Sequence, residues 1–398
     1  MQAVHPGWPR ERQYTEEGMA SADGTELPAA GVQAERGATC SEICRLSTCE
    51  YKGCHTERCF AELPEVKKAL GPLIRSAKAT AKSRIETRTP FSKEYVWVRS
   101  KLLGSGAFGD VYRCRRQDED QYQYAVKEIN IAAFGEVNTL RDIFREVEVL
   151  QELSSSNMCH VVEFVGFHRS HETAWIVLRL LPGQPLSKLI KGMRRVAEND
   201  RHAIVLRLAT ELLEMLSVSH LKGIAHGDLK PDNVFIDLQN CHRMTHVLDW
   251  GLACKHEPGS KVVILQGTLE YLAPEVVSGW IAKSKGAEPQ PVCPSAADMW
   301  SAGCLLLEAY TSQSPFQMGW WRLATMQQCT GILKLQTNWA AGGKGAKKLE
   351  SILSRCAPQA QTFFRGLLEY DPRQRLTASQ ALHHPYLSFG QSSSRKHD

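Results

Sequence analysis

The sequence contains no run of about 18 apolar residues, the length that usually marks a membrane-spanning helix. Its first residues, MQAVHPGWPRERQYTEEG, also lack the apolar core of a signal peptide. Net charge is low as well, because 48 Lys and Arg stand against 43 Asp and Glu, a formal charge of +5. These absences give no reason to expect a membrane or nucleic-acid partner. We therefore expect an intracellular protein of the cytoplasm, with the nucleus also open.

Paired CxxC motifs are absent too. Of the 13 cysteines, eight are scattered between Cys114 and Cys356, where we expect reduced, buried thiols rather than a disulfide framework. The other five lie near His55: Cys40, Cys44, Cys49, Cys54 and Cys59. Their separations of 4, 5, 5 and 5 residues differ from those of a typical zinc site. Zinc binding therefore stands beside reactive, oxidisable or lipid-modified thiols as an alternative.

The length of 398 residues exceeds the roughly 250–300 at which a single core stops growing, which predicts two lobes and additional tails. Residues 1–90 show no sustained apolar periodicity and are predicted to be largely disordered. The end of this segment is basic, which fits either a solvated linker or a segment for nuclear entry or phosphate contact. Its basic residues are Lys67, Lys68, Arg75, Lys78, Lys82, Arg84 and Arg88. Residues 389–398 are Ser-rich and predicted to be a disordered tail.

From Tyr95 onward, β-branched and aromatic runs such as YVWVRSKLL and YQYAVKEINI predict consecutive strands. Residues 140–153 then place Leu140, Phe144, Val147 and Leu150 at helical spacing. Two more strand-like runs, VVEFVGF and TAWIVLRLL, precede a mainly helical remainder. We predict a small, mostly β lobe over residues 95–182 and a larger, mostly α lobe over residues 183–388. Within the larger lobe, residues 279–294 carry Pro and Gly without periodicity and are predicted to form a mobile surface loop.

A glycine-rich stretch, LGSGAFGDVY, lies among the predicted strands. Glycines without Cβ atoms let a strand–turn–strand approach a polyphosphate and direct backbone N–H groups toward it. A dinucleotide site would need a helix directly after the glycines, whereas strand residues follow here. A glycine-rich hairpin without a ligand is the alternative. The candidate nucleotide-binding residues are Leu103, Gly104, Ser105, Gly106, Ala107, Phe108 and Gly109, with Val111 against the base.

A lysine stands in an apolar strand, at Ala125-Val126-Lys127. Burying it without a partner would be costly, so we expect it to face a carboxylate, and Glu146 on the following helix is suitably placed. Such a pair would fix the ammonium against phosphates, whereas an ordinary surface lysine is the alternative. Ala125, Leu178 and Leu180 are candidates to line the base.

Two later stretches, HGDLKPDN and LDWGLA, carry the reactive groups. Asp228 offers a carboxylate that can orient an attacking hydroxyl, and Lys230 can neutralise a transferring phosphoryl group. Asn233 and Asp249 offer the hard oxygen ligands that Mg²⁺ prefers. His226 is expected to pack within the loop rather than to catalyse.

In this order and spacing, the motifs resemble those of eukaryotic-type protein kinases over about Tyr95 to Leu387. The stretches GTLEYLAPE, DMWSAG and DPRQR continue the resemblance. It implies a bilobal α+β kinase fold, ATP and Mg²⁺ as cofactors, a protein substrate, and a buried ion pair between Glu275 and Arg375. Lys230 and Thr268 are typical of the serine/threonine kinases in this family. Nothing in the sequence indicates an oligomeric state.

The chain departs from the family pattern at two positions. Gly227 stands where an arginine usually precedes the catalytic aspartate, so phosphorylation of the following loop, at Ser260 or Thr268, should matter less. Trp250 stands where phenylalanine is usual, and packing of Trp250 and the N-terminal segment is expected to hold the active arrangement. More loosely, the chain resembles NF-κB-inducing kinase and its upstream-kinase relatives.

Three other functions remain as alternatives. A pseudokinase scaffold would bind partners without catalysis. A small-molecule phosphotransferase of the aminoglycoside and choline kinase type shares the HGD motif but lacks the downstream APE segment and DxWSxG helix. An adaptor that binds zinc or nucleic acid would use residues 1–90.

Overall fold

The computed structural model describes most of the chain between residues 90 and 387. The described residues are 90–106, 109–131, 136–155, 160–193, 195–240, 242–316, 325–342 and 346–387. The predictions for residues 1–89, including the candidate zinc residues Cys40 to Cys59, and for the tail 389–398 lie outside these ranges. Ala107 and Phe108 of the glycine-rich stretch also lie outside them.

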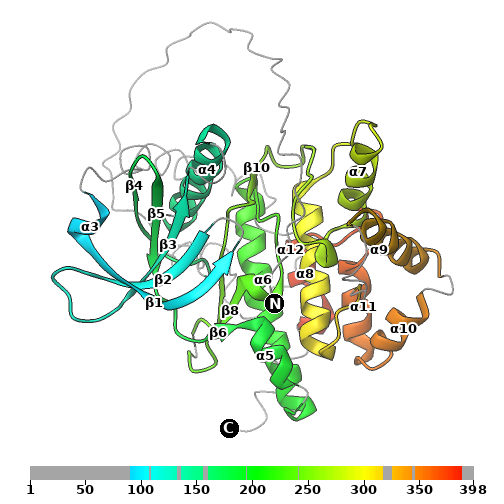
Figure 1. The fold of residues 1–398 in the computed structure, drawn as a ribbon. Coiled ribbons are helices and arrows are strands. Elements are labelled where there is room, and N and C mark those ends of the chain that lie inside the picture. The colour runs from blue at the N-terminus through cyan, green and yellow to red at the C-terminus, as the bar shows by residue number, and fades with distance from the viewer. Residues whose placement is uncertain are drawn as a thin grey trace, which may run out of the picture.

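A five-stranded antiparallel sheet forms the first part of the described chain, in the order β1-β2-β3-β5-β4 (Figure 1). Its strands are β1 Tyr95–Gly106, β2 Gly109–Arg116, β3 Tyr124–Asn130, β4 Phe164–Arg169 and β5 Thr173–Arg179. Successive side chains of a strand point to opposite faces. Ile176 and Val177 are both fully buried, so both faces of this sheet are covered at β5. The predicted start of the strands at Tyr95 is confirmed.

Each face of the sheet packs against a helix. On one face lies α4, Glu136–Ser155, whose Val147 and Leu150 are buried as its helical spacing predicted. On the other face the short helix α3, Phe91–Glu94, inserts Phe91 among aromatic rings, stacked 5.1 Å from Trp175. The sheet is therefore held from both sides, which gives β3 and the glycine-rich hairpin a fixed base.

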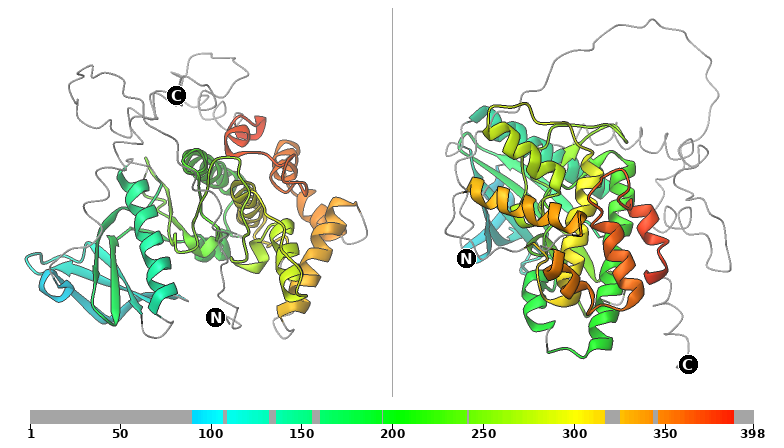
Figure 2. Two further views of the ribbon diagram at one scale, coloured as in Figure 1. Left: turned by 90° about the horizontal axis from the view of Figure 1, so that it is seen from above. Right: turned by 90° about the vertical axis from the view of Figure 1, so that its right-hand side faces the viewer.

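The second part of the described chain is mainly helical (Figures 1 and 2). Its helices are α5 Leu186–Met193, α6 Glu198–Leu221, α7 Pro274–Ser284, α8 Pro294–Thr311, α9 Thr325–Ala340, α10 Ala346–Leu353, α11 Pro358–Leu367 and α12 Ala378–Leu382. Helix α8 is buried over almost its whole length and packs against α6 and α11. A helix that is apolar all round belongs in a core. It therefore serves as the central support of this lobe.

Short strands place the chemically active loops between the two lobes. One small sheet contains β6 Gln184–Pro185, β8 Val234–Ile236 and β9 Thr245–Val247, and a second pairs β7 Ile224–Ala225 with β10 Cys254–Lys255. The loop 226–233, which includes the short 3₁₀ turn Pro231–Asn233, runs from β7 to β8. The β9–α7 segment, residues 248–273, begins with the LDWG stretch and includes the 3₁₀ turn Leu269–Tyr271. Both candidate reactive stretches therefore leave the same pair of small sheets.

Two expectations for the helical lobe had different outcomes. The ion pair of Glu275 and Arg375 is confirmed, with two contacts of 2.7 and 3.0 Å and a fully buried guanidinium. The loop predicted over residues 279–294 is wrong at its start, because α7 continues to Ser284. Trp280 is buried there, so packing overrides the weak local pattern.

Within the described ranges, no helix is long and apolar enough to cross a membrane.

Candidate active site

The loop 226–233 is fixed through its backbone by a buried carboxylate. Asp298, near the start of α8, accepts hydrogen bonds from the N–H groups of His226 at 2.6 Å and Gly227 at 2.9 Å. His220 Nε2 lies 3.0 Å from the same side chain. Burial opposes ionisation of Asp298, but His220 and the Gly227 N–H outweigh it and hold its pKa below the usual value. The loop is thus attached directly to the central helix.

Gly227 has a backbone conformation that excludes a side chain. Its φ is +78°, and a Cβ atom there would lie 2.5 Å from the carbonyl oxygen of Leu252. Glycine adopts such a φ without steric cost, whereas other residues rarely do. The arginine that is usual here would therefore need a different path of the loop. The backbone around position 227 therefore fits the glycine that the sequence has in place of the usual arginine.

Asp228 lies at the centre of a small hydrogen-bonded group. Its Oδ2 atom is 2.6 Å from Lys230 Nζ, and its Oδ1 accepts hydrogen bonds from the backbone N–H and hydroxyl of Thr268 at 2.8 and 2.7 Å. Lys230 Nζ also donates to Thr268 Oγ1 at 2.8 Å, and Asn233 Nδ2 donates to the Asp228 carbonyl at 2.9 Å. The predicted residues Asp228, Lys230 and Asn233 are therefore brought together, with Thr268 added.

His226 packs within its loop, as expected. Its ring is fully buried and lies 4.7 Å from the ring of Trp250. Because the Asp228 N–H donates to Nδ1 at 3.2 Å, we assign the ring proton to Nε2, which donates to the Leu248 carbonyl at 2.9 Å. The imidazole thereby connects the loop 226–233 to the LDWG stretch.

Trp250 is fully buried, as a residue that packs against this loop should be. Its indole N–H has no hydrogen-bond partner among the described residues, which differs from the expectation that a buried indole finds one. The larger ring is accommodated by burial and by a tilted contact with the His226 ring rather than by a polar contact.

The lysine of β3 meets two carboxylates from different parts of the chain. Lys127 Nζ lies 2.7 and 2.9 Å from the two oxygens of Glu146 on α4 and 3.0 Å from Asp249 Oδ1. Burial acts to lower the pKa of Lys127, but Asp249 and Glu146 outweigh it and raise that pKa above its usual value. The predicted Lys127–Glu146 pair is confirmed, and Asp249 joins it.

The two carboxylates respond differently to that lysine. Desolvation of Glu146 dominates and raises its pKa, although Lys127 opposes this. For Asp249, desolvation is outweighed by the Lys127 ammonium, which holds the pKa below its usual value. Asp249 also has a left-handed backbone, with φ +58°, and its carboxylate contacts Lys127. Asp249 is therefore the better anionic ligand of the two.

Hard oxygen donors for a divalent cation are present beside Asp228. Asp249 supplies carboxylate oxygens, and Asn233 uses its Nδ2 on the Asp228 carbonyl. No described group donates to Asn233 Oδ1, so this oxygen is available to a ligand. A carboxylate and an amide oxygen suit Mg²⁺ better than they suit softer metals. The donor set fits the predicted cation.

The described residues of the glycine-rich stretch form two paired strands, β1 and β2, as its sequence predicted. Gly104 pairs with Val111, and Ser105 Oγ donates to Asp110 Oδ1 at 2.6 Å. A Cβ atom at Gly109 would lie 2.0 Å from the Glu128 carbonyl oxygen of β3, so this glycine allows β2 and β3 to approach. No helix follows, which excludes the dinucleotide arrangement for this stretch.

The apolar candidates lie on or next to the strands of the five-stranded sheet. Ala125 of β3 stands directly opposite Leu178 of β5, and Val111 of β2 stands opposite Lys127. Leu180 follows β5, with its N–H bonded to the Gln123 carbonyl at 2.9 Å. Leu103 of β1 is 43% exposed, so it can still cover a ligand. The predicted base-lining residues therefore fall on neighbouring strands.

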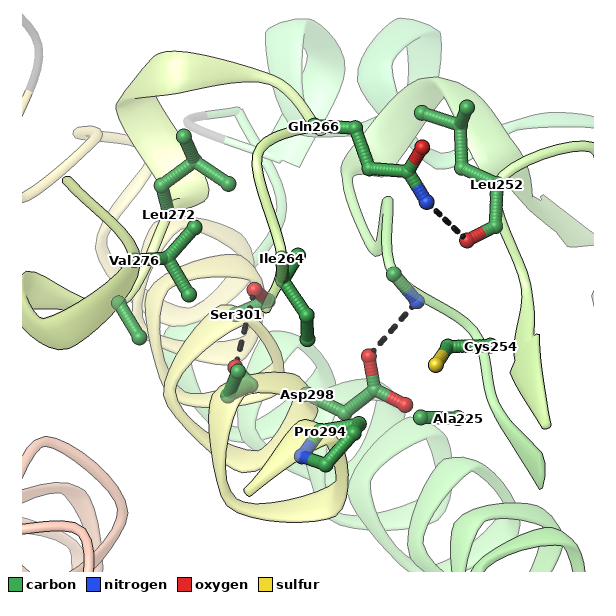
Figure 3. A pocket seen from close by; sticks show the side chains of 13 residues that line it. Ala225, Leu252, Cys254, Ile264, Gln266, Leu272, Val276, Pro294, Asp298 and Ser301 are labelled. Atoms are coloured by element: carbon green, nitrogen blue, oxygen red, sulfur yellow. Dashed lines mark hydrogen bonds between the residues drawn. The ribbon is translucent and has the colours of Figure 1, made fainter. Parts of the chain in front are cut away.

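A small cavity lies behind the loop 226–233, between the β9–α7 segment and α8 (Figure 3). Gly227 and Asp298 form part of its wall, and the Gly227 N–H donates to Asp298 Oδ1 at 2.9 Å. Across the cavity, Gln266 Nε2 donates to the Leu252 carbonyl at 2.9 Å. This bond joins two parts of the β9–α7 segment. It lies close to Gly227, the position at which an arginine is usual.

Sequence reasoning missed two contributors to this site. Asp298 lies within the DMWSAG stretch, and a single carboxylate near the start of the apolar run DMWSAGCLLL is a usable signal for a buried polar role. The sequence marks Thr268 as typical of one kinase class and as a possible phosphorylation site, but it does not predict that its N–H and hydroxyl both bond to Asp228.

Comparisons with known proteins agree with this geometry. Residues 97–387 match the family model described as protein kinase domain. The chain is 29% identical to the serine/threonine-protein kinase RAD53 of Saccharomyces cerevisiae over 83% of its length, which is 37% of that protein. It is 26% identical to calcium-dependent protein kinase 12 of Oryza sativa over 83% of its length, which is 54% of that protein. The chain therefore spans about a third to a half of the length of these relatives.

Proposed function

The chain belongs to the protein kinase family, and from this premise we propose that it transfers the γ-phosphate of ATP to serine and threonine hydroxyls of proteins. The observation that carries the proposal is that two groups of reactive side chains lie on neighbouring segments. Asp228 contacts Lys230 in the loop 226–233, and Lys127 of β3 contacts both Glu146 and Asp249. The Leu248 N–H, next to Asp249, donates to the Asn233 carbonyl at 2.8 Å and so joins the two segments.

In this proposal ATP binds between the two lobes. Its base lies among five apolar residues of one sheet and its end: Leu103, Val111, Ala125 and Leu178 lie on strands, and Leu180 follows β5. Its phosphates lie under the glycine-rich hairpin, where backbone N–H groups can donate to them. Lys127, held in place by Glu146, contacts the α and β phosphates.

Asp249 and Asn233 would hold Mg²⁺ through a carboxylate oxygen and an amide oxygen. The bound cation supplies positive charge that neutralises phosphate oxygens. The chain contributes the fixed positions of these two ligands. Asn233 is buried and bonded to the Asp228 backbone, so its amide oxygen keeps one orientation.

Asp228 accepts the proton of the substrate hydroxyl and orients its oxygen toward the γ-phosphorus. Lys230 lies 2.6 Å from Asp228 and would stabilise charge that develops on the transferring group. Thr268 keeps one oxygen of Asp228 occupied and therefore fixes the rotation of the carboxylate. Catalysis in this arrangement is positional and electrostatic.

Transfer of labelled γ-phosphate from Mg²⁺-ATP to a generic protein substrate tests the proposal. We expect activity in the wild type, none in Asp249→Ala, and wild-type activity in the exposed-site control Asp118→Ala. Binding of ATP without transfer by the wild type would instead indicate a pseudokinase scaffold. Transfer of phosphate only to small alcohols would instead indicate a small-molecule phosphotransferase.

A further inference from the structure

A lysine at the start of the β9–α7 segment contacts two carboxylates on α4. Lys255, the second residue of β10, places its Nζ 3.0 Å from Glu152 Oε2 and 3.8 Å from Glu148 Oε2. Glu152 is well covered, with a side chain that is 12% exposed, whereas Lys255 is 39% exposed. Figure 1 shows β10 beside α4 at the boundary between the lobes.

Helix α4 therefore uses two different faces. Glu146 contacts Lys127, while Glu148 and Glu152, four residues apart, lie about 120–160° around the helix from Glu146 and meet Lys255. Two carboxylates at this spacing repel each other on a helix. Lys255 offsets that repulsion and at the same time attaches the helix to β10.

On the other side of the contact, Lys255 belongs to a short β ladder. Lys255 pairs with Ile224 and Cys254 with Ala225 in the antiparallel β10–β7 ladder. The next residue, His256, donates its N–H to the Gly223 carbonyl at 2.8 Å. Because β7 leads directly into the loop 226–233, a contact with Lys255 positions α4 relative to Asp228.

No cation can come from position 227, because the backbone there excludes a side chain. A phosphate on the β9–α7 segment would therefore lack the arginine that pairs with it in related kinases. Lys255 is a cation that already lies on this segment and reaches α4 without any phosphate.

We propose that Lys255 is a positioning residue that holds α4, and with it Glu146, in the place where Glu146 meets Lys127, without phosphorylation of the β9–α7 segment. The inference rests on the proposed kinase function. It predicts that Lys255 affects the use of ATP and leaves the binding of the protein substrate unchanged.

Charge reversal in phosphatase-treated full-length protein tests this inference. Lys255→Glu places three carboxylates together, and we expect kcat/KM for ATP to fall about threefold to tenfold. Lys255→Arg should retain activity, and Lys255→Glu with Glu152→Lys should recover to within about twofold of wild type because the pair is re-formed with opposite sign. KM for the protein substrate and Tm should not change. The control Lys261→Glu makes the same charge change on an exposed site of the same segment.

Hydrogen exchange of the α4 amides provides a readout that does not depend on catalysis. We expect faster exchange in Lys255→Glu and wild-type exchange in the reversed pair and in Lys261→Glu. Unchanged exchange and ATP kinetics in Lys255→Glu, an equal loss in Lys261→Glu, or no recovery in the reversed pair would each overturn the inference. If the wild type transferred no phosphate, the proposed function would fail, and the exchange data would still decide whether Lys255 positions α4.

Discussion

The two lobes hold their reactive groups in different ways. In the helical lobe, Asp228 sits in a loop whose backbone is bonded to Asp298, a residue of the buried helix α8. In the sheet lobe, Lys127 is oriented by ion pairs to the side chains of Glu146 and Asp249. The position of Asp228 is thus fixed by the core of the helical lobe. The orientation of Lys127 depends instead on the position of α4.

This difference separates stability from activity. Backbone hydrogen bonds to a buried carboxylate form when the helical lobe folds, so the position of Asp228 needs no further event. The Lys127–Glu146 contact can be lost by a movement of α4 that leaves both lobes folded. Substitutions in the two halves should therefore give different combinations of lost activity and lost stability.

The largest effect is expected at Asp228. Asp228→Asn keeps the shape of the side chain and removes the group that accepts the hydroxyl proton, so kcat should fall about 10²- to 10⁴-fold. Affinity for ATP and Tm should stay near their wild-type values, as measured by equilibrium binding and thermal unfolding. Appreciable turnover in this variant would contradict the role given to Asp228.

The next largest effect is expected on stability, at the buried ion pair of the helical lobe. Arg375→Met leaves Glu275 without its buried partner and three carbonyl groups without a donor, so unfolding should become easier by about 3–5 kcal/mol. Arg373→Met is a matched control, because Arg373 lies two residues away and is 82% exposed in its pair with Asp371. Chemical unfolding should show a large loss in the first variant and little change in the second. Equal losses would contradict the contrast between buried and exposed pairs.

A third effect should appear in activity alone. In Glu146→Gln, Lys127 keeps its contact with Asp249, so no buried charge is left unpaired and Tm should hardly change. The lysine loses the partner that orients it, and kcat/KM for ATP should fall by up to about 100-fold. Steady-state kinetics beside the exposed control Glu172→Gln would measure this. A large loss of Tm in Glu146→Gln would mean that α4 belongs to the core after all.

Local sequence patterns predicted the parts of the site that lie within a single helix, strand or hairpin. The strands from Tyr95, the inward face of α4 and the glycine hairpin all follow from side-chain periodicity and from the lack of a following helix. The pairing of Glu275 with Arg375 came only from the family resemblance, because no local pattern links two such distant residues.

Contacts between distant segments were not predictable in this way. Asp298 and His226 are 72 residues apart, and Lys255 meets Glu152 only because β10 packs beside α4. The end of α7 was also misjudged, since Gly279 and its neighbours weaken the helical pattern while Trp280 is buried against the lobe. In each case tertiary packing decides, and its partners cannot be identified from one segment.

The smallest effect is expected where the two lobes meet. His160 follows α4, has a left-handed backbone with φ +72°, and points into the helical lobe. Its Nδ1 lies 3.0 Å from the Thr245 carbonyl and 3.5 Å from Glu211, and its Nε2 lies 3.7 Å from Glu214. Burial acts to lower the pKa of His160, but the nearby carboxylates of Glu214 and Glu211 outweigh it and raise the pKa.

Because the pKa of His160 is higher in the folded protein, its contribution is fully present below the unfolded value of about 6.5 and is lost as pH rises through the folded value. We expect His160→Asn to cost on the order of 1 kcal/mol at pH 6 and less at pH 8.5. Asparagine tolerates the left-handed backbone, so the variant removes the charge without new strain. The buried neighbour His246 has a pKa lowered by burial and by His160, so its contribution to stability changes with pH in the opposite direction. The measurement is therefore the difference between wild type and His160→Asn in urea unfolding at the two pH values. A difference that grows with pH would show that the contact between the lobes does not depend on an imidazolium.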